Sequence, residues 1–167
     1  MTRKNTISDK QPLDWGSRFS LLADQARDPR LKAYYRAAHI PGHTPVKQVK
    51  FLALDMETTG LDPKTDAIIS VGFLPLFHDR ILCSGARYWV VRPDHPIPDI
   101  QTTIHGITHT RMHTCPDFST ILEPLLQAMA GRVVLVHYHH IERHFLDRTV
   151  LDTTGDTLVF PVVDTME

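Results

Sequence analysis

The most constraining feature of the chain is the stretch KFLALDMETTG at residues 50–60, where an apolar segment runs into two carboxylates. Residues 49–55 are mostly apolar and β-favouring, which predicts a buried strand. Side chains two residues apart on a strand point to the same face, about 6.5–7 Å apart. Asp55 and Glu57 are therefore expected to converge at the carboxyl end of this strand.

Two carboxylates this close repel each other unless one is protonated or a cation lies between them. Their hard oxygens suit Mg²⁺ or Mn²⁺, and pairs of such ions about 3.5–4 Å apart serve phosphodiester hydrolysis. An exposed acidic edge is the simpler explanation of an isolated Asp-x-Glu pair. The surroundings favour a site, because α/β sheets place ligands at the carboxyl ends of strands. Residues 58–60, Thr-Thr-Gly, add hydroxyls and a glycine that lets backbone approach a ligand closely.

The rest of the chain predicts one α/β domain with an N-terminal extension. Residues 1–45 are expected to be a disordered start and a helical extension, and residues 46–167 the main domain. Periodicity and turn residues predict the following elements: helices from 13 and from 29, strands at 49–55, 68–77, 81–91, 132–137 and 158–164, a short helix and turn at 99–108, and helices at 117–130 and 140–151. A hairpin turn at 78–80 leads to the third strand, in which Gly85 is a candidate bulge.

The helical extension carries an aromatic stripe, which includes Trp15, Phe19, Tyr34 and Tyr35. Such a stripe fits either a brace packed on the main domain or a surface that binds a protein partner. The brace is the simpler interpretation.

The charge composition of the chain does not by itself indicate a nucleic-acid partner. The 18 basic and 19 acidic side chains leave a formal charge of −1, so any nucleic acid would have to be held by a local site. The N-terminus is polar, and the longest aliphatic runs are too short to span a bilayer. We expect a cytoplasmic protein with no membrane partner and with reduced thiols at Cys83 and Cys115.

Four stretches, in order, resemble the DEDD family of 3′–5′ exonucleases, whose members include the proofreading subunit of bacterial DNA polymerase III. They are FLALDMETTGLDP at 51–63, TIHGIT at 103–108, PDFSTILEPLLQAMAG at 116–131 and VHYHHIERHFLD at 136–147. The resemblance implies a ribonuclease-H-like mixed sheet flanked by helices. It also implies release of mononucleotides from the 3′ end of single-stranded DNA or RNA, with two Mg²⁺ or Mn²⁺ ions.

The resemblance also implies roles for individual residues. Asp55 would bridge both metal ions, Glu57 would hold one, and Glu142 would take the place of the second motif's aspartate. The residues implied to contact the 3′-terminal nucleotide are Thr58, Thr59, Leu61 and His105.

The chain departs from the family pattern at two points. Glu142 is one methylene longer than aspartate, and a displacement of about 1 Å can lower a rate about a hundredfold. Asp147, five residues along the same helix, is expected to face elsewhere. The family's third motif, a His followed five residues later by an Asp, is absent before Glu167. We expect a chain truncated at its C-terminus, nearly inactive as it stands, with self-association through an uncovered strand at 158–163.

Two rival functions remain open on the sequence alone. A non-catalytic module of the same fold would bind nucleic-acid ends or a partner, and it is favoured by Glu142 and the missing third motif. A zinc-binding module is the second rival, because His105, His109 and His113 are spaced at i, i+4 and i+8 and a further four histidines cluster at 137–144. Residues 106–110, with a glycine and β-branched threonines, argue against a continuous helix there.

Overall fold

A computed structural model describes residues 14–37, 39–93 and 114–166 of the chain. Its six strands are β1 (Phe51–Thr58), β2 (Ile68–Phe77), β3 (Arg80–Ile81), β4 (Arg87–Val90), β5 (Val133–Val136) and β6 (Val162–Asp164). Its helices are α1 (Trp15–Gln25), α2 (Pro29–Arg36), α4 (Phe118–Met129) and α5 (His139–Thr154), with 3₁₀ turns at Val46–Gln48 and Cys83–Gly85. The expected disordered start and the expected short helix and turn at 99–108 lie outside the described ranges.

The strands form one mixed sheet, in the order β3-β2-β1-β5-β6, and β4 also pairs with β2. Strand β1 runs antiparallel to β2 and parallel to β5. Leu52, Leu54 and Met56 alternate along β1 and are buried, which is the period-2 pattern of a half-buried strand. The strand runs three residues further than expected from the sequence, so both carboxylates lie within it.

Strand β2 covers the predicted residues 68–77, whereas the predicted third strand at 81–91 is divided. The 3₁₀ turn Cys83–Gly85 separates β3 from β4, and both short strands lie along β2. Pro75 explains the break, because it accepts a hydrogen bond from the N–H of Leu82 but has no N–H to donate in return. Gly85 packs against the Pro75 ring, where a Cβ would lie 2.9 Å from Cγ. This glycine belongs to the turn and not to a bulge within a continuous strand.

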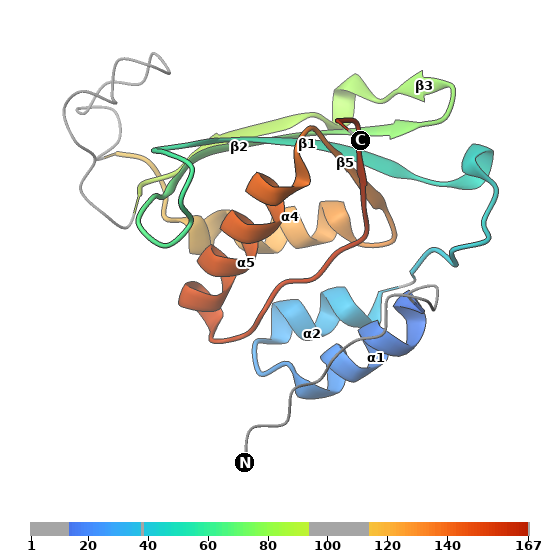
Figure 1. The fold of residues 1–167 in the computed structure, drawn as a ribbon, viewed down its shortest axis with the longest axis horizontal. Coiled ribbons are helices and arrows are strands. Elements are labelled where there is room, and N and C mark those ends of the chain that lie inside the picture. The colour runs from blue at the N-terminus through green and yellow to red at the C-terminus, as the bar shows by residue number, and fades with distance from the viewer. Residues whose placement is uncertain (1–13, 38, 94–113, 167) are drawn as a thin grey trace.

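The helices of the described residues gather on one side of the sheet (Figure 1). Helix α4 has the predicted apolar face, buried over its whole length: Phe118, Ile121, Leu122, Leu125, Leu126 and Met129. Gly131 follows it with φ of 66°, the left-handed conformation that commonly ends a helix. None of the described helices is both long and apolar enough to cross a membrane.

The N-terminal helices pack on the domain and share its hydrophobic core. Phe19, Leu31, Tyr34 and Tyr35 are buried in the same cluster as the sheet residues. Asp28 caps α2 and pairs with Arg30, as its position before Pro29 predicts. The aromatic stripe is therefore largely buried, as the brace interpretation requires.

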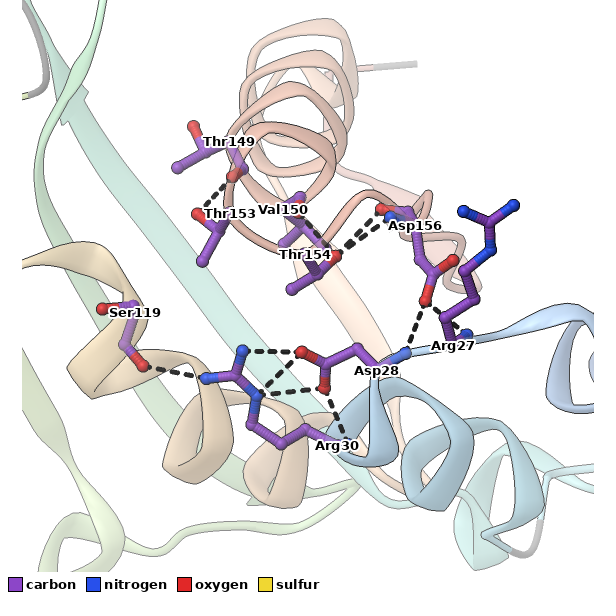
Figure 2. Close-up of polar contacts among 9 residues, drawn as sticks. All are labelled: Arg27, Asp28, Arg30, Ser119, Thr149, Val150, Thr153, Thr154 and Asp156. Atoms are coloured by element: carbon purple, nitrogen blue, oxygen red, sulfur yellow. Dashed lines mark hydrogen bonds and ion pairs between the residues drawn. The ribbon is translucent and has the colours of Figure 1, made fainter.

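Polar contacts fasten these helices to the rest of the domain (Figure 2). Asp156, which follows α5, accepts the backbone N–H groups of Arg27 and Asp28, each at 2.7 Å. Arg30 donates to the carbonyl of Ser119 in α4 at 3.1 Å. The extension is thus held at both α4 and the segment after α5.

The segment before β6 corrects one expectation. Leu158 and Phe160 were expected to be uncovered, but only 3% and 2% of their surfaces are exposed. The phenol of Tyr35 reaches this segment, accepting the N–H of Val159 at 2.9 Å and donating to the carbonyl of Thr157 at 2.7 Å. Val163 remains exposed. Leu158 and Phe160, on which part of the expected self-association rested, are thus buried within the chain's own core.

Candidate active site

An open hollow of about 490 Å³ lies beside the carboxyl-terminal half of β1. Strand β5 pairs with β1 only at residues 51–53 of β1. The rest of β1 therefore has no β5 partner along this edge. The start of α5 closes the other side. The described residues that line the hollow are Asp55, Met56, Glu57, Thr58, Thr59, Gly60, Leu61, His137, Ile141 and Glu142. Six of the seven site residues expected from the sequence are in this set, and the seventh, His105, lies outside the described residues.

Asp55 and Glu57 are on the same face of β1, opposite Gly72 and Ser70 of β2. Asp55 is exposed and Glu57 is half-buried. The pairing with β2 becomes irregular between Glu57 and Thr58, immediately after the second carboxylate. The strand therefore turns away from the sheet where the hollow opens.

The loop after β1 is held together by its own side chains. The Thr58 hydroxyl donates to the carbonyl of Gly60 at 2.6 Å, and the Thr59 hydroxyl accepts the N–H of Ala67 at 2.9 Å. Asp66 accepts the N–H of Asp62 and the Thr59 hydroxyl. The two threonine hydroxyls thus shape the loop, while Leu61 is left 79% exposed at its edge.

Gly60 lies close to another side chain of the loop. A Cβ at this position would lie 2.5 Å from an oxygen of Asp66. The glycine is thus required by close packing within the loop, before any ligand is considered.

Glu142 is the buried member of the carboxylate set. It lies in the first turn of α5 with only 3% of its surface exposed, and its Oε2 has no hydrogen-bond partner among the described residues. Burial, with smaller contributions from the nearby charges of Asp55 and Asp164, raises the pKa of Glu142 to about 7. A buried carboxylate with an unsatisfied oxygen requires either a proton or a cation.

The carboxylates of the hollow are suitable ligands for a divalent cation, although they are not arranged as a complete metal site. Asp55, Glu57 and Glu142 bring carboxylate oxygens to one hollow, and the orphaned Oε2 of Glu142 is a ready ligand atom. Within residues 14–37, 39–93 and 114–166, no group of three or more His, Cys, Asp or Glu side chains is arranged to hold an ion. Binding would thus require side-chain movement.

The comparisons with known proteins agree with this geometry. The family model described as exonuclease matches residues 52–152, which is more than half of the chain. The chain belongs to the exonuclease family. This assignment covers β1, the loop after it and α5 through Asp152, and so includes every described residue of the candidate site.

Individual relatives of this exonuclease chain are longer proteins. A DNA polymerase III subunit epsilon-like protein of Rhodobacter capsulatus is 30% identical over 124 residues, covering 74% of this chain and 18% of that protein. The DNA polymerase III subunit epsilon of Treponema pallidum is 30% identical over 119 residues, covering 71% of this chain and 54% of that protein. The chain therefore spans about half or less of the length of these relatives.

A solved structure supports the fold. The metal-free form of an E. coli ExoI–ssDNA complex aligns with a TM-score of 0.60 at 15% identity, over 71% of this chain and 28% of that chain. Together with the family match, this likeness shows the ribonuclease-H-like mixed sheet of exonucleases, as expected from the sequence.

Three histidines at the start of α5 lie ring against ring, with one pair tilted and the other stacked. His139 and His140 have ring centroids 4.2 Å apart, and His140 and His144 are 5.6 Å apart. No group of three or more potential metal ligands is found among the described residues, which include the cluster at 137–144. The other three histidines, 105, 109 and 113, lie outside those ranges.

Three side chains make contacts that the sequence analysis did not predict. Asp147 faces away from the hollow, as its helical angle predicts, and accepts the N–H of Leu158 at 2.8 Å. His137 lines the hollow and contacts the Thr165 hydroxyl at 3.0 Å. Asp164 accepts backbone N–H groups at the start of α5. No local sequence pattern marks these contacts, because each joins residues that are 11 or more positions apart.

Proposed function

We propose that this domain is a metal-dependent 3′–5′ exonuclease that releases mononucleotides from the 3′ ends of nucleic acids. The observation that carries the proposal is the meeting of Asp55, Glu57 and Glu142 around one hollow in a chain of the exonuclease family. Three carboxylates in one site suit divalent cations far better than they suit a neutral ligand.

We propose Mg²⁺ or Mn²⁺ as the ion, with two ions in the active protein. When bound, such ions polarise the phosphodiester and supply a hydroxide. Asp55 and Glu57 would hold the ions from the strand, and Glu142 would close the set from α5 after losing its proton. Thr58 and Thr59 keep the loop in place at the hollow, and Leu61 offers an exposed apolar side chain to the terminal base.

The proposed substrate is a single-stranded 3′ end, either DNA or RNA. The E. coli ExoI relative is described as a complex with single-stranded DNA, and other relatives are named as DNA polymerase III subunits. The hollow is open to solvent, and nothing among its described residues distinguishes a deoxyribose from a ribose.

A non-catalytic module that binds nucleic-acid ends is the second candidate. Glu142 favours it, because a longer carboxylate with a pKa of about 7 is a poorer metal ligand at neutral pH than aspartate.

The decisive experiment combines metal titration with a nuclease assay. Titration calorimetry with Mn²⁺ should show binding by the wild-type chain, loss of binding in Asp55→Asn, and wild-type binding in the control Asp79→Asn. Asp79 is an exposed carboxylate paired with Arg80 in the β2–β3 hairpin. Equal Mn²⁺ binding by wild type and Asp55→Asn would contradict the proposed site.

The nuclease assay then separates the two candidate functions. A 5′-labelled single strand is incubated with Mn²⁺, and products are resolved by size. Stepwise shortening from the 3′ end that Asp55→Asn abolishes supports the exonuclease. Binding of the 3′ end without shortening, at saturating Mn²⁺, supports the binding module.

A further inference from the structure

The turn that leads from β5 into α5 is strained. Tyr138 has φ of 75°, and it is the only described residue other than glycine with a positive φ. For an L-residue such as tyrosine, this left-handed conformation costs about 1–2 kcal/mol relative to the right-handed one. Tyr138 also provides no side-chain cap for α5. The turn therefore needs support from elsewhere in the fold.

Asp164, in β6, provides this support. Its Oδ1 accepts the N–H of Tyr138 at 2.9 Å, and its Oδ2 accepts the N–H of His139 at 2.7 Å. Asp164 thus acts as the missing cap, satisfying N–H groups at the helix start and placing a negative charge at the positive end of α5. The same carboxylate accepts the N–H of Met166 and contacts Nδ1 of His139. These N–H groups, first that of His139, hold the pKa of Asp164 far below its usual range, so it is ionised at neutral pH.

The neighbouring residue strengthens the clamp. Asp164 lies opposite Val136 in the parallel pairing of β5 with β6. Thr165 donates both its N–H and its hydroxyl to the carbonyl of Val136, at 2.9 and 3.1 Å. Two consecutive residues therefore hold the turn at 136–139: Asp164 binds its end and Thr165 binds its beginning.

Glu142 follows His139 by three residues, in the first turn of the same helix. Its carboxylate lines the hollow beside Asp55, so any rotation of the helix start moves it relative to that partner. We propose that Asp164 is a positioning residue, which holds Tyr138 in its left-handed conformation and thereby places Glu142 beside Asp55 for metal binding. This inference rests on the proposed function, since the position of Glu142 matters only if Glu142 binds a metal ion.

Asp164 is not itself placed as a ligand. Both of its oxygens are engaged by nitrogen donors, and it is not among the described residues that line the hollow. Apart from the direct effect of its charge on Glu142, Asp164 therefore acts on the site through the backbone of the turn.

Asp164→Asn tests the proposal, with Asp156→Asn as the matched control. Asp156 also accepts two backbone N–H groups, but it joins the N-terminal helices to the end of α5. Both substitutions should lower the melting temperature. Below both melting temperatures, Asp164→Asn should weaken Mn²⁺ binding by about 10–100-fold, as loss of a residue that orients a ligand typically does, whereas Asp156→Asn should leave the Kd unchanged.

Tyr138→Gly provides a rescue, because glycine adopts a positive φ without strain. The double variant Asp164→Asn/Tyr138→Gly should recover much of the Mn²⁺ affinity lost in Asp164→Asn. Wild-type affinity in Asp164→Asn, or no recovery in the folded double variant, would overturn the proposal.

Amide hydrogen exchange tests the turn without metal. The N–H of Ile141 donates to the carbonyl of Tyr138 at 3.1 Å, so its exchange rate reports on the turn although it does not touch Asp164. Exchange at Ile141 should accelerate in Asp164→Asn and not in Asp156→Asn, and equal rates in all three proteins would overturn the proposal. If wild type binds no Mn²⁺, the proposed function fails, while this measurement still decides whether Asp164 holds the turn.

Discussion

Tyr35 and Val159 are joined by a hydrogen bond of 2.9 Å, in which the backbone N–H of Val159 donates to the phenol oxygen. The two residues are 124 positions apart, and the bond ties the N-terminal helices to the segment that leads into β6. Burial raises the pKa of Tyr35 to about 12, so the phenol keeps its proton and continues to donate to Thr157. Helix α2 thus helps to hold the segment that precedes β6.

Tyr35→Phe should destabilise the fold without affecting metal binding. Phenylalanine keeps the packing but leaves the N–H of Val159 without its acceptor, which costs about 1–3 kcal/mol. Urea unfolding should show a lower midpoint with an unchanged slope. Tyr88→Phe is the control, because Tyr88 is 63% exposed and its loss should change the unfolding free energy by less than about 0.5 kcal/mol.

Glu142→Gln should stabilise the metal-free chain at pH 8 but not at pH 5. In the unfolded chain the carboxyl of Glu142 loses its proton near pH 4.5, whereas in the folded chain its pKa is about 7. Between these values the folded state binds more protons, so the contribution of Glu142 to stability falls as pH rises and stays low above pH 7. Glutamine does not titrate, and its advantage should reach roughly 1–3 kcal/mol at pH 8.

The measurement is urea unfolding of both proteins in chelator at the two pH values. Glu123→Gln, an exposed carboxylate on α4, should match wild type at both. If Glu142→Gln offers the same advantage at pH 5 as at pH 8, the buried charge is not the reason for it.

Gly60→Ala should lower stability through a clash with Asp66. The added methyl would lie 2.5–2.7 Å from the carboxylate, which is already fixed by the N–H of Asp62 and the Thr59 hydroxyl. We expect a loss of about 1–3 kcal/mol, and the double variant with Asp66→Ala should lose less than the sum of the two single variants. Gly42→Ala is the control, because no atom lies within 4 Å of a Cβ at that position. Additive losses for Gly60 and Asp66 would show that the two residues do not interact.

Much of the fold is predictable from the sequence because the strongest patterns are local. Strand β2 and helix α4 follow their hydrophobic periodicity, and Asp28 with Pro29 marks the start of α2. The division between β3 and β4 is not predictable from the sequence. It depends on which side of Pro75 lacks an N–H donor, the side of β1 or that of β3 and β4. That information appears only once the sheet is assembled.

The candidate site shows the same limit. The sequence predicts that Asp55, Glu57 and Glu142 share one site, from the spacing of the first two and the motif position of the third. The three residues do line one hollow, because β1 and the start of α5 meet there. The sequence gives no sign that Asp164 caps α5, since a cap is normally adjacent to its helix and this one is 25 residues away from His139. Nor does it show that Gly60 makes room for Asp66 within the loop.

Leu61→Ala should weaken binding of a 3′ end without weakening the fold. Leu61 is 79% exposed at the edge of the hollow, so its loss should change the unfolding free energy by less than about 0.5 kcal/mol. If its side chain packs on the terminal base, removing it should forfeit about 1 kcal/mol of buried apolar contact, which is a several-fold increase in Kd. Fluorescence anisotropy of a short single strand, labelled at its 5′ end and titrated in chelator so that no cleavage occurs, measures this. Ile81→Ala is the matched control, since Ile81 is 61% exposed but lies in β3, outside the hollow. Equal Kd values for Leu61→Ala and Ile81→Ala would mean that the terminal base does not rest on Leu61, and the placement of the substrate in this hollow would have to be abandoned.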